Sequence, residues 1–128
     1  MMIVDSVGWL AFFGGEPLAA RYRAHLLGRD DLLCPTVILY EVCKRVQLHA
    51  GRQAAATVAA QLLKTHVVPL DEALATIAAR VSIAHHLPMA DAIIYATAVT
   101  FDAILVTSDA HLRGLPLVTY LTPTAREA

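Results

Sequence analysis

Short, almost wholly apolar runs that alternate with longer helical stretches constrain the fold of this chain more than any other feature. Each run is a few residues long and shows no alternation of polar and apolar positions, which fits a strand that is buried on both faces. A parallel sheet covered by helices on both sides has this pattern. The sequence predicts strands at Met2–Val4, Leu32–Cys34, Val67–Leu70, Ala103–Val106 and Leu117–Tyr120.

Turn and capping residues divide the rest of the chain into helices. A helical stretch is expected in two parts around Gly14 and Gly15, with Pro17 near the start of the second part. Further helices are expected from a Thr36 cap to about His49, over Gln53–Lys64, from an Asp71 cap to about Ala84, from Pro88 to about Phe101, and in a short turn through Leu112. The prediction is an α/β three-layer sandwich with a short, mainly parallel central sheet flanked by helices, formed by residues 1–128 as a single domain.

Composition excludes several classes of protein. Of the 128 residues, 57% are hydrophobic and 16% are charged, which is too apolar for a disordered chain. The longest uncharged stretch, 114–125, is interrupted by prolines and is shorter than the roughly 20 residues of a membrane-spanning helix. The net charge of −1 gives no support to a protein that coats a nucleic-acid backbone. Cys34 and Cys43 have neither metal nor redox spacing, so we expect a cytoplasmic protein with reduced thiols.

Each of four carboxylates, considered alone, has an ordinary structural explanation. Asp5 follows the first strand and could simply end it, and Asp109 follows the 103–106 strand and could cap the next turn. Asp91 is expected in or near the first turn of its helix, where the helix dipole favours an acid. Glu41 lies beside an apolar helix stripe, with Arg45 four residues on as an ion-pair partner.

Taken together, these acids indicate a divalent-cation site. Parallel sheets bind ligands beyond the carboxyl ends of their strands, which is where Asp5 and Asp109 are expected. Carboxylates buried close to one another lose hydration and repel each other, and a cation removes that cost. Hard oxygen ligands favour magnesium or manganese over zinc. Such an ion can hold a phosphate oxygen and help to generate hydroxide for in-line attack.

Four motifs, in this order, resemble those of the PIN-domain nucleases, and among them the VapC toxins of toxin–antitoxin pairs. They are IVDS (Ile3–Ser6), PTVILYEV (Pro35–Val42), ADAIIYATA (Ala90–Ala98) and LVTSD (Leu105–Asp109). The resemblance spans nearly the whole chain and implies a PIN-like fold and a magnesium- or manganese-dependent endoribonuclease that leaves 5′-phosphate and 3′-hydroxyl ends.

The same resemblance implies roles for individual residues. Asp5 and Asp91 match the main metal ligands of the family, and Asp109 and Glu41 match the residues that complete its acidic cluster. Ser6 and Thr107 match positions where a hydroxyl often steadies a carboxylate. All four acids are present, so the resemblance implies an active enzyme.

The resemblance also implies partners. VapC toxins are generally homodimers that a cognate antitoxin neutralises by blocking the acidic site. A homodimer, an antitoxin and an RNA substrate are therefore expected here, and no membrane. Lys44, Arg45 and Arg113 are candidates for RNA contact, although such residues are more often solvated surface charges.

Three other readings stay open. His85, His86 and His111 could bind a transition metal, although no two of them have the four-residue spacing of a helical zinc motif. A receiver-type phosphoacceptor domain would share the doubly wound layout and the first aspartate, but it normally has two adjacent acids there and a later lysine after a strand. A non-catalytic RNA- or protein-binding module on a similar α/β fold is the third alternative.

Overall fold

A five-stranded parallel sheet forms the centre of the protein. The computed structural model describes residues 1–15 and 18–122. The strands are β1 (Met2–Val4), β2 (Leu32–Pro35), β3 (His66–Val68), β4 (Ile104–Thr107) and β5 (Val118–Tyr120), in the order β3-β2-β1-β4-β5. Each pair of neighbouring strands is parallel. The prediction of a mainly parallel sheet is confirmed.

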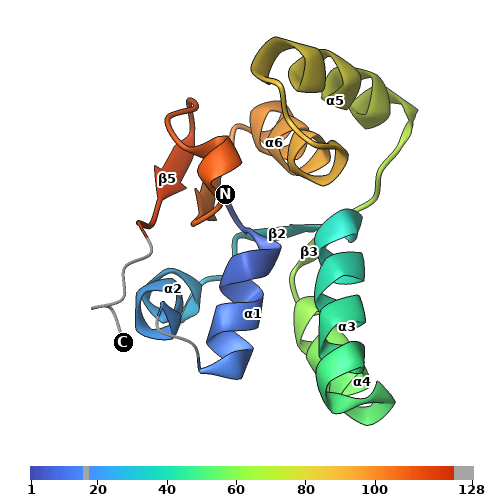
Figure 1. The fold of residues 1–128 in the computed structure, drawn as a ribbon, viewed down its shortest axis with the longest axis vertical. Coiled ribbons are helices and arrows are strands. Elements are labelled where there is room, and N and C mark those ends of the chain that lie inside the picture. Colours follow the sequence, from blue (N-terminus) through green and yellow to red (C-terminus); the bar gives the residue numbers. More distant parts are fainter. Residues whose placement is uncertain (16–17, 123–128) are drawn as a thin grey trace.

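Helices cover both faces of this sheet. They are α1 (Ser6–Gly14), α2 (Ala19–Leu26), α3 (Thr36–Ala50), α4 (Arg52–Leu62), α5 (Glu72–His85) and α6 (Met89–Phe101), followed by a 3₁₀ turn, η1 (Ala110–Leu112). Figure 1 shows α5 and α6 on one side of the strands and α1 and α2 on the other. Helix α3 packs against both α1 and α4, so it continues the layer that α1 begins. The prediction of an α/β three-layer sandwich is therefore confirmed.

Some predicted boundaries differ from those in the structure. Thr36 is the first residue of α3 and does not cap it, because Pro35 occupies the cap position and no side chain bonds the first amides. Leu117 lies outside β5 because its φ of 70° is left-handed and cannot extend a strand. Asp71 caps α5 as expected, with its carboxylate accepting from the amide of Leu74 at 2.8 Å. The position expected for Pro17 lies outside the described residues.

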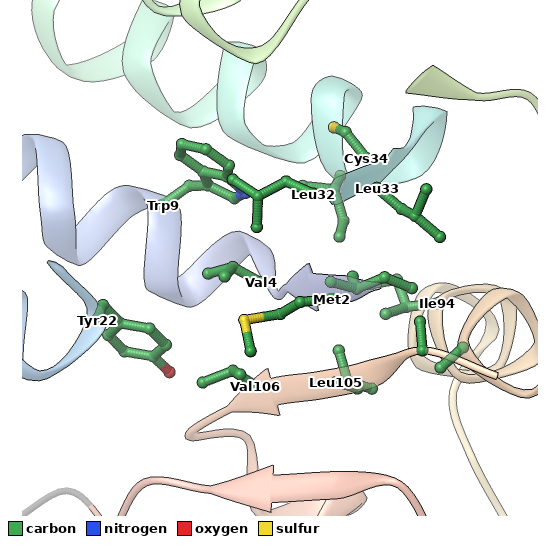
Figure 2. Close-up of a cluster of buried hydrophobic side chains, with 14 of the residues drawn as sticks. Met2, Val4, Trp9, Tyr22, Leu32, Leu33, Cys34, Ile94, Leu105 and Val106 are labelled. Atoms are coloured by element: carbon green, nitrogen blue, oxygen red, sulfur yellow. The ribbon is translucent and has the colours of Figure 1, made fainter. Parts of the chain in front are cut away.

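The core is built from the apolar strands and the helix faces next to them. Val4 of β1 and Leu105 and Val106 of β4 are fully buried, as is Ile94 of α6, and Figure 2 shows these side chains between the helical layers. Burying a side chain of this size contributes about 1.5–3 kcal/mol, so the two central strands hold the layers together. Among the described residues, no helix is both long enough and apolar enough to span a bilayer.

Gly8 permits a close contact between α1 and α2. Tyr22 of α2 is fully buried, and its ring lies against the backbone of α1 at Gly8. A Cβ atom at position 8 would lie 2.5 Å from Cδ1 of Tyr22 and 2.6 Å from Cγ1 of Val4. Real Cβ atoms do not come that close to their neighbours, so the residue here must be glycine for the two helices to pack as they do.

We expect Gly8→Ala to lower the free energy of unfolding by about 1–2 kcal/mol, measured by urea denaturation. Overpacking typically costs about 1–3 kcal/mol, and the better helix propensity of alanine returns at most about 1 kcal/mol. In a Tyr22→Leu background the loss should shrink, because the ring that the methyl group meets is gone. A Gly8→Ala variant as stable as the wild type would contradict this account of the packing.

Candidate functional site

The candidate site lies where the order of the sheet reverses. The chain runs from β1 outward to β2 and β3, then returns to β4 on the other side of β1. In open parallel sheets a ligand crevice forms at such a point, beyond the carboxyl ends of the strands. The order also differs from the 2-1-3-4-5 order of flavodoxin-like folds, to which a receiver domain would belong, so the receiver-type alternative is wrong.

Asp5 is the first acid at this point. It follows β1 directly, caps α1 and is 2% exposed. One carboxylate oxygen accepts from the amide of Ser6 at 2.7 Å and from the Ser6 hydroxyl at 3.4 Å. The other oxygen accepts from the hydroxyl of Thr107, at the end of β4, at 2.7 Å. The side chain is therefore held both from the start of α1 and from the end of β4, the neighbouring strand.

Asp109 is tied to the same threonine. Its amide donates to Oγ1 of Thr107 at 2.9 Å, so one hydroxyl connects Asp5 to the loop that carries Asp109. The carboxylate of Asp109 also caps η1 by accepting from the amide of His111 at 2.9 Å. The capping role expected for Asp109 is thus present together with its place at the site. Nearby, the hydroxyl of the buried Tyr22 bonds Oγ of Ser108 at 2.8 Å.

Asp91 and Glu41 reach the site from helices on opposite layers. Asp91 lies in the first turn of α6 and is 8% exposed. Glu41 lies on α3, beside the fully buried residues Ile38 and Val42. Its Oε1 atom is buried and has no hydrogen-bond partner among the described residues. Glu41 and Arg45 form no close ion pair in the described part of the chain, although the charge of Arg45 lowers the pKa of Glu41.

The charges of the four acids act on one another. Burial raises the pKa of Asp5, and the negative charge of Asp109 raises it further, while the hydrogen bonds from Thr107 and Ser6 lower it. Burial raises the pKa of Glu41, as do the charges of Asp5 and Asp109, while a hydrogen bond from Ser6 and the charge of Arg45 lower it. Burial, followed by the charges of Asp109 and Asp5, raises the pKa of Asp91 to about 7. Asp5, Glu41, Asp91 and Asp109 therefore form one electrostatic unit, called here the acidic cluster.

This arrangement fits a divalent cation. The acidic cluster offers oxygen donors, and Oε1 of Glu41 is a buried acceptor that lacks a donor. A bound cation would remove the repulsion that raises the pKa of Asp91. Among the described residues, possible ligand atoms of Asp91, Asp109 and His111 all lie within 4.8 Å of one another. Asp5 and Glu41 are not part of that group.

His111 is the residue at this site that the sequence did not assign to it. Its Nδ1 atom lies 3.0 Å from Oδ1 of Asp109 and 3.4 Å from Oδ2 of Asp91. The sequence feature that could have assigned His111 to the site is its position two residues after Asp109, in a predicted helical turn. The structure does not add the other two histidines of the transition-metal alternative to this group, and the ring of His85 instead packs edge-on against Tyr95, with centroids 5.7 Å apart.

The three cations considered for RNA contact are placed differently from one another. Lys44 lies over the ring of Tyr40, with Nζ 5.6 Å from the ring centroid. Arg113 lies over the ring of Tyr120 at 5.3 Å. Arg45 lines an apolar groove between α1, α3 and α4, with a volume of about 470 Å³. Arg45 is the one of the three whose charge acts on the acidic cluster, because it lowers the pKa of Glu41. The role of all three cations in RNA binding stays a prediction.

In the absence of divalent ions, we expect the free energy of unfolding to fall as the pH rises from about 4 to about 7. The folded carboxyl of Asp91, with a pKa near 7, keeps a proton that the unfolded carboxyl, with a pKa of 3.8, has lost. Stability from this group is fully present below the lower pKa and lost as the pH rises through the higher one. Urea denaturation in EDTA across this range measures the slope.

Asp91→Asn should flatten that slope, and the exposed Asp102→Asn should leave it unchanged. The slope should not vanish in Asp91→Asn, because burial also raises the pKa values of Asp5 and Glu41. Parallel stability curves for the wild type and Asp91→Asn would show that the carboxyl of Asp91 is not strained in the fold.

Solved structures with a similar fold include a toxin–antitoxin complex and a toxin. A toxin–antitoxin complex from Klebsiella pneumoniae superposes with a TM-score of 0.79 at 18% identity, covering 93% of this chain and 96% of that chain. VapC20 of Mycobacterium tuberculosis, a toxin that cleaves the sarcin-ricin loop, superposes with a TM-score of 0.69 at 19% identity, covering 81% and 85%. VapBC2 of Rickettsia felis, bound to a DNA fragment from its promoter, superposes with a TM-score of 0.71 at 11% identity, covering 94% and 96%.

These low identities establish similarity of fold. No curated protein matches the chain. The family assignment comes instead from the sequence itself, because the family model described as PIN domain matches residues 2–116, which is most of the chain. The expectation drawn from the four motifs is confirmed, and this chain belongs to the PIN domain family.

Proposed function

We propose that this protein is a divalent-metal-dependent endoribonuclease and the toxin of a toxin–antitoxin pair, acting in the cytoplasm through one catalytic domain over residues 1–128. The observation that carries the proposal is the acidic cluster at the switch point of the sheet, with a pKa near 7 for Asp91 and an unpartnered buried oxygen on Glu41. Membership of the PIN domain family supports the nuclease class.

In this proposal Asp5 and Asp91 are the main metal ligands, and Asp109 and Glu41 complete the cluster. Magnesium or manganese is the expected ion, because the acids supply oxygen donors. When bound, the ion would neutralise charge on the scissile phosphate and lower the pKa of water for in-line attack. The products would carry 5′-phosphate and 3′-hydroxyl ends.

The residues around the acids act by positioning them. Thr107 donates to Asp5 and accepts from the amide of Asp109, which keeps both aspartates at the same crevice. Ser6 donates to the second oxygen of Asp5 through both its amide and its hydroxyl. Carboxylates fixed in this way would hold the ion in place, so that its positive charge would need no reorganisation when negative charge develops on the phosphate.

A cognate antitoxin, a second copy of the chain and an RNA substrate are the proposed partners. One structure with this fold is a toxin–antitoxin complex, and another is a toxin that cleaves the sarcin-ricin loop, and both support this set of partners. Exposed apolar side chains on α3, α5 and α6, such as Leu48, Ile83 and Met89, leave surface for protein contacts.

Purified protein, freed of any antitoxin, should cut total RNA into discrete fragments with 5′-phosphate ends when magnesium or manganese is added, and not in chelator. Asp5→Asn and Asp91→Asn should each lower the cleavage rate by more than about 100-fold, beyond the 10–100-fold typical of residues that only support a metal ligand. Asp102→Asn is the matched control and should cleave at the wild-type rate.

If folded wild-type protein and Asp91→Asn are equally inert toward RNA in both ions, the acids are structural. The fold would then serve as the non-catalytic RNA- or protein-binding module of the remaining alternative. Full activity in Asp5→Asn would remove that residue from the proposed metal ligands.

A further inference from the structure

His111 extends the acidic cluster with a nitrogen donor. In the 3₁₀ turn η1, its amide bonds the carboxylate of Asp109 at 2.9 Å, and its ring nitrogen Nδ1 lies 3.0 Å from the same oxygen. The next residue, Leu112, is fully buried and anchors the turn in the core. Backbone and core packing together therefore place the imidazole beside the acids.

The spacing of the donor atoms is close to that of ligands on one ion. Two ligands at about 2.1 Å from an ion are about 3.0 Å apart at a right angle and about 4.2 Å apart when opposite each other. Nδ1 of His111 lies 3.0 Å from an oxygen of Asp109 and 3.4 Å from an oxygen of Asp91. All three ligand atoms lie within 4.8 Å of one another. An ion can therefore bind all three with only small movements of the side chains.

To bind an ion through Nδ1, the imidazole of His111 must carry its proton on Nε2. The side chain of His111 is 60% exposed, so its Nε2 atom can carry the proton and be hydrated while Nδ1 faces the carboxylates. A histidine that only supported a ligand would donate its proton to a carboxylate and leave the ion to the oxygens. The two roles differ in whether nitrogen touches the ion.

We propose that Nδ1 of His111 is a direct metal ligand together with Asp91 and Asp109, and that this mixed oxygen–nitrogen site prefers manganese to magnesium. Magnesium takes oxygen ligands and dehydrates reluctantly, whereas an imidazole donor suits transition ions. The inference rests on the proposed function only in placing a divalent ion at the acidic cluster, and it assigns the ion that the oxygen donors alone leave open.

The test is pulsed electron paramagnetic resonance of the manganese-loaded full chain, which detects nitrogen bound to Mn²⁺ without any cleavage assay. The wild type and His49→Gln, a matched change at an exposed histidine, should show the ¹⁴N coupling of an imidazole ligand, and His111→Gln should lose it. Wild-type protein carrying ¹⁵N-histidine should replace the ¹⁴N signal with that of ¹⁵N, which tests the ligand without a mutation.

Equilibrium titration of each ion supplies the second measurement. His111→Gln should weaken manganese binding by at least about tenfold, the lower end of the loss seen when even a supporting residue is removed. It should change magnesium binding less than twofold. Equal weakening of both ions would overturn the proposal, because it is the result expected of a supporting residue.

The outcomes separate this inference from the proposed function. If manganese binds to the wild type without nitrogen coupling, His111 is not a ligand, and the metal-dependent nuclease proposal stands. If neither ion binds to the folded wild type, the acidic cluster is not a metal site, and both proposals are overturned.

Discussion

The hydroxyl of Thr107 is the contact on which the candidate site depends. It donates to Asp5 at the end of β1 and accepts from the amide of Asp109 beyond β4, at 2.7 and 2.9 Å. The two strands are neighbours in the sheet, although about a hundred residues of chain separate them. A single buried group thus joins the first and last parts of the acidic cluster, and the sheet supplies the rigid frame that keeps them together.

Burial gives this cluster its chemistry. Carboxylates in water would ionise independently, but here desolvation and mutual repulsion raise the pKa values of Asp5, Glu41 and Asp91. The favourable free energy from burying the large apolar core offsets that cost, and Ile3, Val4 and Val106 are fully buried next to the site. The structure therefore holds negative charge in a place where a cation binds favourably, which is a common arrangement at functional sites.

Much of this could be anticipated along the chain. The apolar runs indicated the strands because a strand covered on both faces has no polar positions. The helices between them indicated a parallel sheet, because parallel strands are usually joined by a helix that crosses over the sheet. The four acids could be singled out because so few charged residues occur in this sequence. Thr36 and Leu117 show the limit of such reasoning, since local propensity cannot tell which residue carries the cap or a left-handed φ.

His111 shows a second limit. A histidine two residues after an aspartate has no recognised metal spacing, and only the 3₁₀ turn, anchored by the buried Leu112, brings its ring to Asp109 and to Asp91 from another helix. The order of polar and apolar residues is a property of the chain, so it specifies the class of fold and the family. The distances among Asp5, Glu41, Asp91, Asp109 and His111 depend on how separate elements pack, so only the three-dimensional structure decides which of them share a site and what ion they can hold.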